Sequence, residues 1–333
     1  MNRGEDLFGP RVFYRRLLGL AIFSAVVLLA PLVVEDPYYL ELLFLCHYYV
    51  ILASSWDLLS GFTGNINFGH AFFIGGAGYM GAVLNLNLGW PPWLTLPIGG
   101  LTAALCGLVV GTVTLRLKGP YFASVTFCFG ALLYKWFMVS SKFLGGEEGL
   151  SGIVPLTDSP SGNYYLSGLL MLAVVFILYF IAKSPFGLIL RSIGENETAS
   201  EGSGINTTYY KVVAFIISAA IAGVAGAMYA HAQMHVGPEM THDSLSALIL
   251  MMAVVGGMGS IIGPIMGAYL LTLVNESLRF MGELRLLIYS GAVVAVIFFA
   301  PKGLLEIFSQ AIRRMVGSRR SKGVPERNGE KSV

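Results

Sequence analysis

The chain consists mainly of long apolar segments separated by short stretches of turn-forming residues. Two of these segments, 17–34 and 164–182, contain no charged residue. An apolar run of roughly 18 or more residues can cross the ~30 Å hydrocarbon core of a bilayer as a helix. The glycine-rich third, eighth and ninth segments also allow a re-entrant or broken helix. We predict ten transmembrane helices, near 17–34, 38–59, 67–88, 93–115, 121–140, 164–182, 211–231, 244–258, 260–278 and 284–300.

Composition supports an all-α integral membrane protein. The 333 residues are 55% hydrophobic and 12% charged, and the mean hydropathy is +0.71. A soluble domain carries about 25% charged residues, so a soluble fold is excluded. Cys46, Cys106 and Cys128 all lie inside apolar segments without CxxC spacing, which indicates small core side chains. The first segment is longer than the apolar region of a signal peptide, so we expect a retained helix.

The distribution of positive charge predicts the orientation in the membrane. Lys and Arg are retained on the cytoplasmic side. With the N-terminus inside, 17 of the 21 basic residues fall inside: four in the N-terminal tail, two in the fourth loop, three in the sixth loop and eight after the last segment. An even number of spans then places both termini in the cytoplasm.

These boundaries divide the chain into three parts. Residues 1–16 form a basic cytoplasmic tail, 17–300 the transmembrane domain with a long internal loop at 183–210, and 301–333 a second basic cytoplasmic tail. The segment 317–333 is polar and poor in apolar residues, so we expect it to be disordered. It fits a solvated tail that fixes the topology better than a contact with anionic lipid.

Small residues recur at helical spacing. Helices in lipid associate where small side chains allow close backbone contact, so these rows predict a tightly packed bundle. The rows are Gly259/Gly263/Gly267, Ala219/Gly223/Ala227, Ala222/Gly226/Ala230 and Gly107/Gly111.

The stretch from Gly61 to His70 combines helix-weakening glycines with polar side chains. Asn65, Asn67 and His70 bring hydrogen-bonding groups to the start of an apolar segment. Irregular backbone at membrane depth is tolerated where protein or a water-filled cavity satisfies it. We predict that Asn65, Asn67 and His70 shape the route of a transported solute; structural packing is the alternative.

The internal loop 183–210 has the pattern of two short helices. Ser184 suits an N-cap and Pro185 a first helical position, and Asn196 can cap a second helix that ends near Gly204. A short amphipathic helix on this face can dock another protein or the membrane surface. The chain has no phosphate-binding loop of the Walker A type, so a partner must bind any ATP that drives it.

The loop from Ser141 to Tyr164 is the longest predicted external connection. It carries Glu147 and Glu148 amid Gly and Pro, and we predict that these two carboxylates dock a soluble partner on the outer side. A solvated loop without any contact is the alternative.

Six stretches in a fixed order resemble one family, the permease subunits of bacterial ABC importers for branched-chain amino acids, and within it the LivM-type subunit. They cover most of residues 20–305. The stretches are 61–73, 118–127, 145–153, 186–206, 256–264 and 300–304.

This resemblance implies a type-II-like importer bundle in the bacterial inner membrane. It further implies a second permease, two cytoplasmic ATPases that bind ATP, and a periplasmic binding protein as partners. The chain itself would hold no cofactor or metal and catalyse no bond chemistry, and it would bind no nucleic acid. The resemblance also assigns the inner loop to ATPase coupling, with Phe186, Arg191, Glu197, Ala199 and Gly204 as the matching positions.

Departures from the family leave the substrate open. The family usually has Gln and Ser where Asn65 and Asn67 stand, and a stretch richer in Ala and Leu than residues 201–203. Some relatives are associated with urea or short amides, which are the alternative cargo.

Two other classes remain as alternatives. An ion-coupled secondary transporter would carry ionisable residues near the midplane, and candidates are few: Asp57 and Glu276 lie towards segment ends, and His47 lies deep. A membrane enzyme could use a metal held near the outer end of the seventh segment. The residues that would hold it are His231, His235, Glu239, His242 and Asp243.

Overall fold

The computed structural model describes residues 36–117 and 119–282, residues 19, 23–32 and 34, and isolated positions between 284 and 304. The predicted last span at 284–300 lies outside the described residues except for such isolated positions. The predicted tails at 1–16 and beyond residue 304 lie outside them as well.

Helices dominate the described part of the chain, as predicted. Six of them are long and apolar enough to cross a membrane. These are α2 (Pro37–Thr63), α3 (His70–Leu88), α4 (Pro92–Thr114), α5 (Pro120–Val139), α7 (Pro160–Lys183) and α10 (Thr207–Gln233).

Three further helices fall on predicted spans but are shorter. An apolar helix covers Phe23–Leu32 and ends in the 3₁₀ turn η2 (Ala30–Leu32). The helices α11 (Asp243–Gly256) and α12 (Ile262–Ser277) have 14 and 16 residues, fewer than the ~20 that a straight span requires. The 3₁₀ turn η5 (Arg279–Met281) follows α12.

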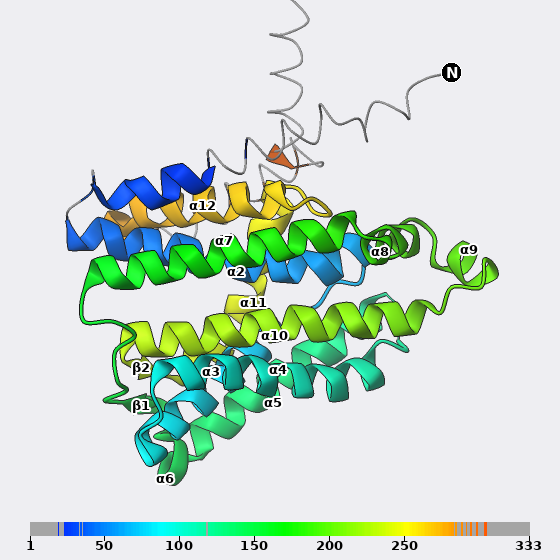
Figure 1. Cartoon of the computed structure of the whole chain (residues 1–333). Helices are drawn as coiled ribbons and strands as arrows, with labels where there is room; N and C mark the ends of the chain where they lie inside the picture. Colours follow the sequence, from blue (N-terminus) through cyan, green and yellow to red (C-terminus); the bar gives the residue numbers. More distant parts are fainter. Residues whose placement is uncertain are drawn as a thin grey trace, which may run out of the picture.

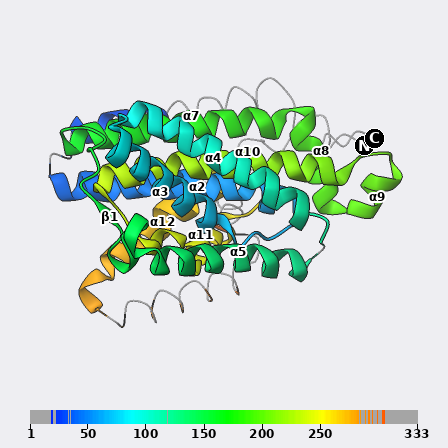
Figure 2. The same ribbon diagram turned by 90° about the horizontal axis from the view of Figure 1, so that it is seen from below.

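The remaining elements gather at the two ends of the bundle. Figures 1 and 2 show the short helices α8 (Pro185–Glu195) and α9 (Glu197–Gly202) together at one end. The opposite end carries a two-residue antiparallel pair in which Leu150 lies opposite Val236. The two strands of this pair are β1 (Leu150–Ser151) and β2 (His235–Val236). The same end also carries α6 (Ser141–Leu144), η3 (Gly146–Glu148) and η4 (Pro238–Thr241).

Small residues bring α4, α10 and α3 into close contact, as their spacing predicted. A Cβ added at Gly107 of α4 would lie 2.8 Å from the Cβ of Ala219 on α10, and one at Gly99 would lie 2.9 Å from the Cβ of Ala227. A Cβ at Gly226 would overlap the backbone of Ile74 on α3. Backbones at this distance leave room for hydrogen only, which explains why these positions are small.

The predicted row Gly259/Gly263/Gly267 is only partly correct. Gly263 and Gly267 lie on α12, where added Cβ atoms would overlap the backbone at Gly257 and Met252. Gly256 of α11 lies against Gly263 of α12, and Met252 of α11 lies against Gly267 of α12, so the two helices run antiparallel. Gly259 instead lies in the turn between the two helices, with φ of 71°. Glycine adopts this left-handed backbone without the steric cost of a side chain.

Candidate functional site

The helical path is broken between α2 and α3, at residues 64–69. Gly64 ends α2 with φ of 74°. The amide of Asn67 donates to Ser60 Oγ (3.2 Å), and that of Phe68 donates to Thr126 Oγ1 (3.2 Å). The amide of Ala71, just inside α3, donates to Ser246 Oγ (2.9 Å). Hydroxyls from α2, α5 and α11 thus replace the missing helical acceptors, as a buried backbone requires.

Asn67 stabilises the broken segment from within. Its side chain is 1% exposed, and its Oδ1 accepts the amide of Gly69 at 2.8 Å. Its carbonyl accepts the indole N–H of Trp56 at 2.7 Å. These contacts are those of a structural anchor for the segment.

His70 starts α3 in a fully buried position. Its Nε2 lies 3.0 Å from Ser55 Oγ on α2, and its Nδ1 has no hydrogen-bond partner among the residues that the structure describes. The carbonyl of Ser55 accepts from the hydroxyl of Ser218 on α10. His70 therefore lies where α2, α3 and α10 meet.

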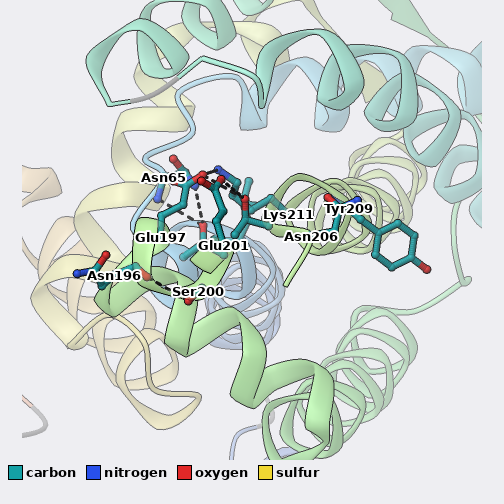
Figure 3. A network of polar contacts seen from close by, with 11 residues as sticks. Asn65, Asn196, Glu197, Ser200, Glu201, Asn206, Tyr209 and Lys211 are labelled. Carbon is teal, nitrogen blue, oxygen red and sulfur yellow. Dashed lines mark hydrogen bonds and ion pairs between the residues drawn. The ribbon is translucent and has the colours of Figure 1, made fainter. Parts of the chain in front are cut away.

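Asn65 does not join the other two predicted route residues. It is half-buried, and its Nδ2 donates to Thr63 Oγ1 at 3.2 Å. Figure 3 shows it beside Glu197, at the end of the bundle that carries α8 and α9. The hydroxyls of Ser60, Thr126 and Ser246 were missed in the sequence; hydroxyl residues isolated in apolar segments were the available signal.

Three glycine-containing stretches meet around the turn between α11 and α12. Asp57 on α2 is 2% exposed, and its Oδ1 accepts the amide of Gly259 at 2.8 Å. One helical turn further on, a Cβ at Gly61 would overlap the Asp57 carboxylate. A Cβ at Gly303 would overlap Gly257. Asp57, expected towards the end of a span, is thus a buried contact between α2 and this turn.

The two short helices form as the capping residues predicted. Ser184 and Asn196 accept amides in the first turns of α8 and α9, Pro185 opens α8, and Gly204 follows α9 with φ of 83°. Each N-cap satisfies an amide that the helix leaves without an acceptor.

Helix α8 packs on the end of α2 that leads into the broken segment. The guanidinium of Arg191 lies 4.8 Å from the ring centroid of Phe62, and a Cβ at Gly194 would overlap the Phe62 carbonyl. The ring of Phe186 lies 5.7 Å from that of Tyr210 on α10. A displacement of α8 therefore acts directly on α2 and α10.

An ion pair fixes α9 to α10. Lys211 Nζ lies 2.7 Å from Glu197 Oε1, and the lysine side chain is 1% exposed. Glu201 accepts the hydroxyl of Thr207 at 2.9 Å, so both glutamates of α9 point back to the first turns of α10 (Figure 3). Lys211, the first residue of the predicted span 211–231 and one of the basic residues counted as internal, is a buried residue of α10. Ala199 and Gly204 are exposed.

The predicted outer residues lie at the opposite end. Glu147 and Glu148 are exposed on η3. His231 is buried between Thr95 Oγ1 and the carbonyl of Val154, each at 2.7 Å. His242 caps α11. Across the part of the chain that the structure describes, no group of three or more His, Cys, Asp or Glu residues could hold a metal ion.

A bundle of long apolar helices with a buried, broken segment and capped surface helices defines a multi-pass membrane permease. The chain belongs to the family described as branched-chain amino acid transport system / permease component, whose model matches residues 38–300. Membership of this family favours an ABC importer subunit over an ion-coupled transporter or a membrane enzyme.

Similar proteins include permeases named for different cargoes. The chain is 31% identical to the high-affinity branched-chain amino acid permease LivM of Salmonella typhimurium, over 77% of this chain and 67% of that protein. It is 27% identical to the autoinducer 2 import permease LsrC of Photorhabdus laumondii, over 59% and 60% of the two chains. It is 30% identical to the nucleoside permease NupC of Lactococcus lactis, over 42% and 49%. No solved structure matches the chain.

Proposed function

We propose that this chain imports branched-chain or other hydrophobic amino acids across a bacterial inner membrane, as one permease of a larger ATP-driven complex. The complex contains a second permease, two cytoplasmic ATPases and a periplasmic binding protein. The similarity to LivM supports the proposal that the cargo is a branched-chain amino acid. The relatives named for autoinducer 2 and nucleosides mark the cargo as the point to test, together with urea and short amides.

One observation supports the mechanism above the others: α8 contacts the end of α2 at Phe62, two residues before the broken segment begins at Gly64. An ATPase that moves α8 would therefore shift the backbone that Asn67 and His70 organise. In this mechanism Phe186, Arg191, Glu197, Ala199 and Gly204 form the coupling surface. Asn65, Asn67 and His70 shape the route, Asn67 by holding the backbone.

Topology completes the proposal. Ten spans with both termini inside place α8 and α9 in the cytoplasm and η3 in the periplasm, which agrees with their separation at opposite ends of the bundle (Figure 1). Residues 1–16 and 301–333 are cytoplasmic tails, and 17–300 form the permease domain.

Cross-linking tests the coupling surface. Leu188 is 50% exposed on α8 and Ala199 is exposed on α9, so single cysteines there should cross-link to the ATPase in the purified complex. Tyr39→Cys, 54% exposed at the outer end of α2, is the control. The exposed Cys128 is first replaced by Ser. Cross-linking from Tyr39→Cys but from neither short helix would refute the proposed contact.

Docking of the binding protein is tested by charge. We expect Glu147→Lys with Glu148→Lys to weaken the stimulation of ATPase activity by loaded binding protein while basal activity stays. Electrostatic docking weakens with salt because the Debye length falls to about 3 Å at 1 M. Stimulation that is equal in variant and wild type at all salt concentrations would assign these glutamates to a solvated loop.

A further inference from the structure

A pocket of about 250 Å³ lies beside η4 and the first turns of α11. It is formed by α2, α10, η4 and α11, and it includes none of the route, coupling or docking residues named above. Its lining includes Tyr48, Tyr49, Tyr229, Glu239, Ser244 and Leu248. This volume lies just under the roughly 300–1,000 Å³ of sites for drug-sized ligands, so it suits a small molecule.

The wall of this pocket combines apolar surface with a carboxylate. The rings of Tyr48 and Tyr229 stack with centroids 4.7 Å apart, and Leu245 and Leu248 add an aliphatic face. The Glu239 side chain is 68% exposed at the mouth. Among the described residues that line the pocket, none is Lys or Arg.

The surroundings add negative charge. Glu41, on the same end of α2, accepts from Gln233 Nε2 at 2.6 Å. The Nε2 of His235 lies 3.8 Å from Glu239 Oε1. Carboxylates and the faces of tyrosine rings both attract an ammonium group.

A second cavity, of about 270 Å³, lacks this chemistry. It lies between α3, α4 and α5, and its described lining, which includes Phe72, Phe137 and Trp136, contains no charged residue. A zwitterion there would lose hydration without compensation.

We propose that the pocket around Glu239 binds an aliphatic amino acid as it enters the permease. The ammonium group lies against Glu239, the branched side chain lies between Tyr229 and Leu248, and the carboxylate lies near the Ser244 hydroxyl, which is 2.9 Å from His242 Nδ1. This assignment rests on the proposed function. Tyr48 and Ser55 are seven residues apart on α2, about 10 Å along the helix, so the pocket lies about two helical turns from the contact between Ser55 and His70.

Binding is tested directly by protection. A cysteine in place of Leu245, which lines the pocket, is alkylated in the purified complex without binding protein. Leucine and 3-methylbutylamine, which carry the ammonium group, should slow alkylation, and 4-methylpentanoate should not. Phe143→Cys, 84% exposed on α6 at the same end, should react equally in all cases. Glu239→Gln added to Leu245→Cys should abolish the protection.

Transport supplies the second readout. In proteoliposomes with loaded binding protein, Glu239→Gln should lower leucine uptake about tenfold, which corresponds to about 1.4 kcal/mol of lost binding free energy. Leu248→Trp, which fills the pocket, should block uptake in an assembled complex. Asp36→Asn removes an exposed carboxylate at the same end but keeps the N-cap of α2, so it should transport normally.

Two outcomes overturn the assignment: leucine fails to protect Leu245→Cys, or Glu239→Gln transports at the wild-type rate. If wild-type complex takes up no leucine at all, the proposed function fails instead. Uptake of leucine with no protection leaves that function in place and refutes the pocket alone.

Discussion

Single buried polar residues decide how this bundle tolerates a broken helix. The backbone amides of residues 67, 68 and 71 donate to hydroxyls on three different helices, and that of residue 69 donates to the side-chain oxygen of Asn67 within the segment. Each buried amide that loses its acceptor costs about 1–3 kcal/mol. A residue such as Asn67 therefore holds the shape of the segment even where it does not touch a solute.

Asn67→Ala should destabilise the assembled complex by about 1–3 kcal/mol, because the amide of Gly69 loses its acceptor. Uptake should fall with it, whereas basal ATPase activity persists. Thermal unfolding and uptake of the purified complex measure both effects. His70→Gln, which keeps a polar group near Ser55, should retain more uptake than His70→Ala. Normal uptake in both Asn67→Ala and His70→Ala would show that this segment serves helix packing and does not shape the route of the solute.

The ion pair between Lys211 and Glu197 should be strongly coupled. Removing one partner of a buried pair leaves an uncompensated charge, which costs up to about 3–5 kcal/mol. We expect Glu197→Gln alone to destabilise the protein more than Glu197→Gln combined with Lys211→Met, which removes both charges. A double-mutant cycle of thermal stability measures the coupling. Additive effects of the two substitutions would mean that the pair contributes little.

At the scale of elements, close backbone contact replaces the hydrophobic effect. Lipid tails are as apolar as Leu or Val, so helices gain stability by packing density. Helix α10 shows this on two sides, since a Cβ added at Gly223 would contact Ala103 of α4 and Ala77 of α3. The antiparallel pair α11 and α12 uses Gly256, Gly263 and Gly267 in the same way.

Gly263→Leu and Gly223→Leu should both reduce the yield of assembled complex, since each side chain would enter occupied space. The effect at Gly263 should be larger, because its added Cβ would overlap the carbonyl oxygen of Gly257, whereas the backbone atom nearest to a Cβ added at Gly223 is the carbonyl oxygen of Gly99, at 2.7 Å. Gly202→Leu is the control, since no atom lies within 4 Å of its added Cβ. Equal yields for all three would contradict the packing argument.

At the scale of the whole molecule, the short helices and the β1–β2 pair lie at opposite ends of the bundle (Figure 2). The predicted topology requires the same separation, because the loop 183–210 is internal and the loop 141–164 external. The separation of the two ends agrees with this topology, and the orientation itself stays a prediction from the charge distribution.

Labelling of intact cells tests this orientation. An impermeant maleimide should modify Phe143→Cys from outside and Leu188→Cys only after the cells are opened, in a background without Cys128. Both side chains are exposed, by 84% and 50%, so accessibility within the fold does not limit the reaction. Labelling of Leu188→Cys in intact cells would show that the topology is the reverse of the predicted one.

The helical class, the approximate bounds of the helices and the caps of α8 and α9 could be predicted from the amino-acid sequence. These depend on local properties: the length of apolar runs, the positions of Ser184 and Asn196, and glycine near the ends. The sequence also predicted close packing at Gly107, Gly223 and Gly263, because small residues at helical spacing have one main use in lipid.

Which polar residues share an environment became visible in the three-dimensional structure. It separated Asn65 from Asn67 and His70, buried Lys211 against Glu197, placed Gly259 in a turn bound to Asp57, and assembled the pocket around Glu239. Each of these contacts joins residues from different helices, and no local pattern encodes which faces will meet. The close packing of many backbones at once fixes those faces, and that packing is a property of the whole bundle.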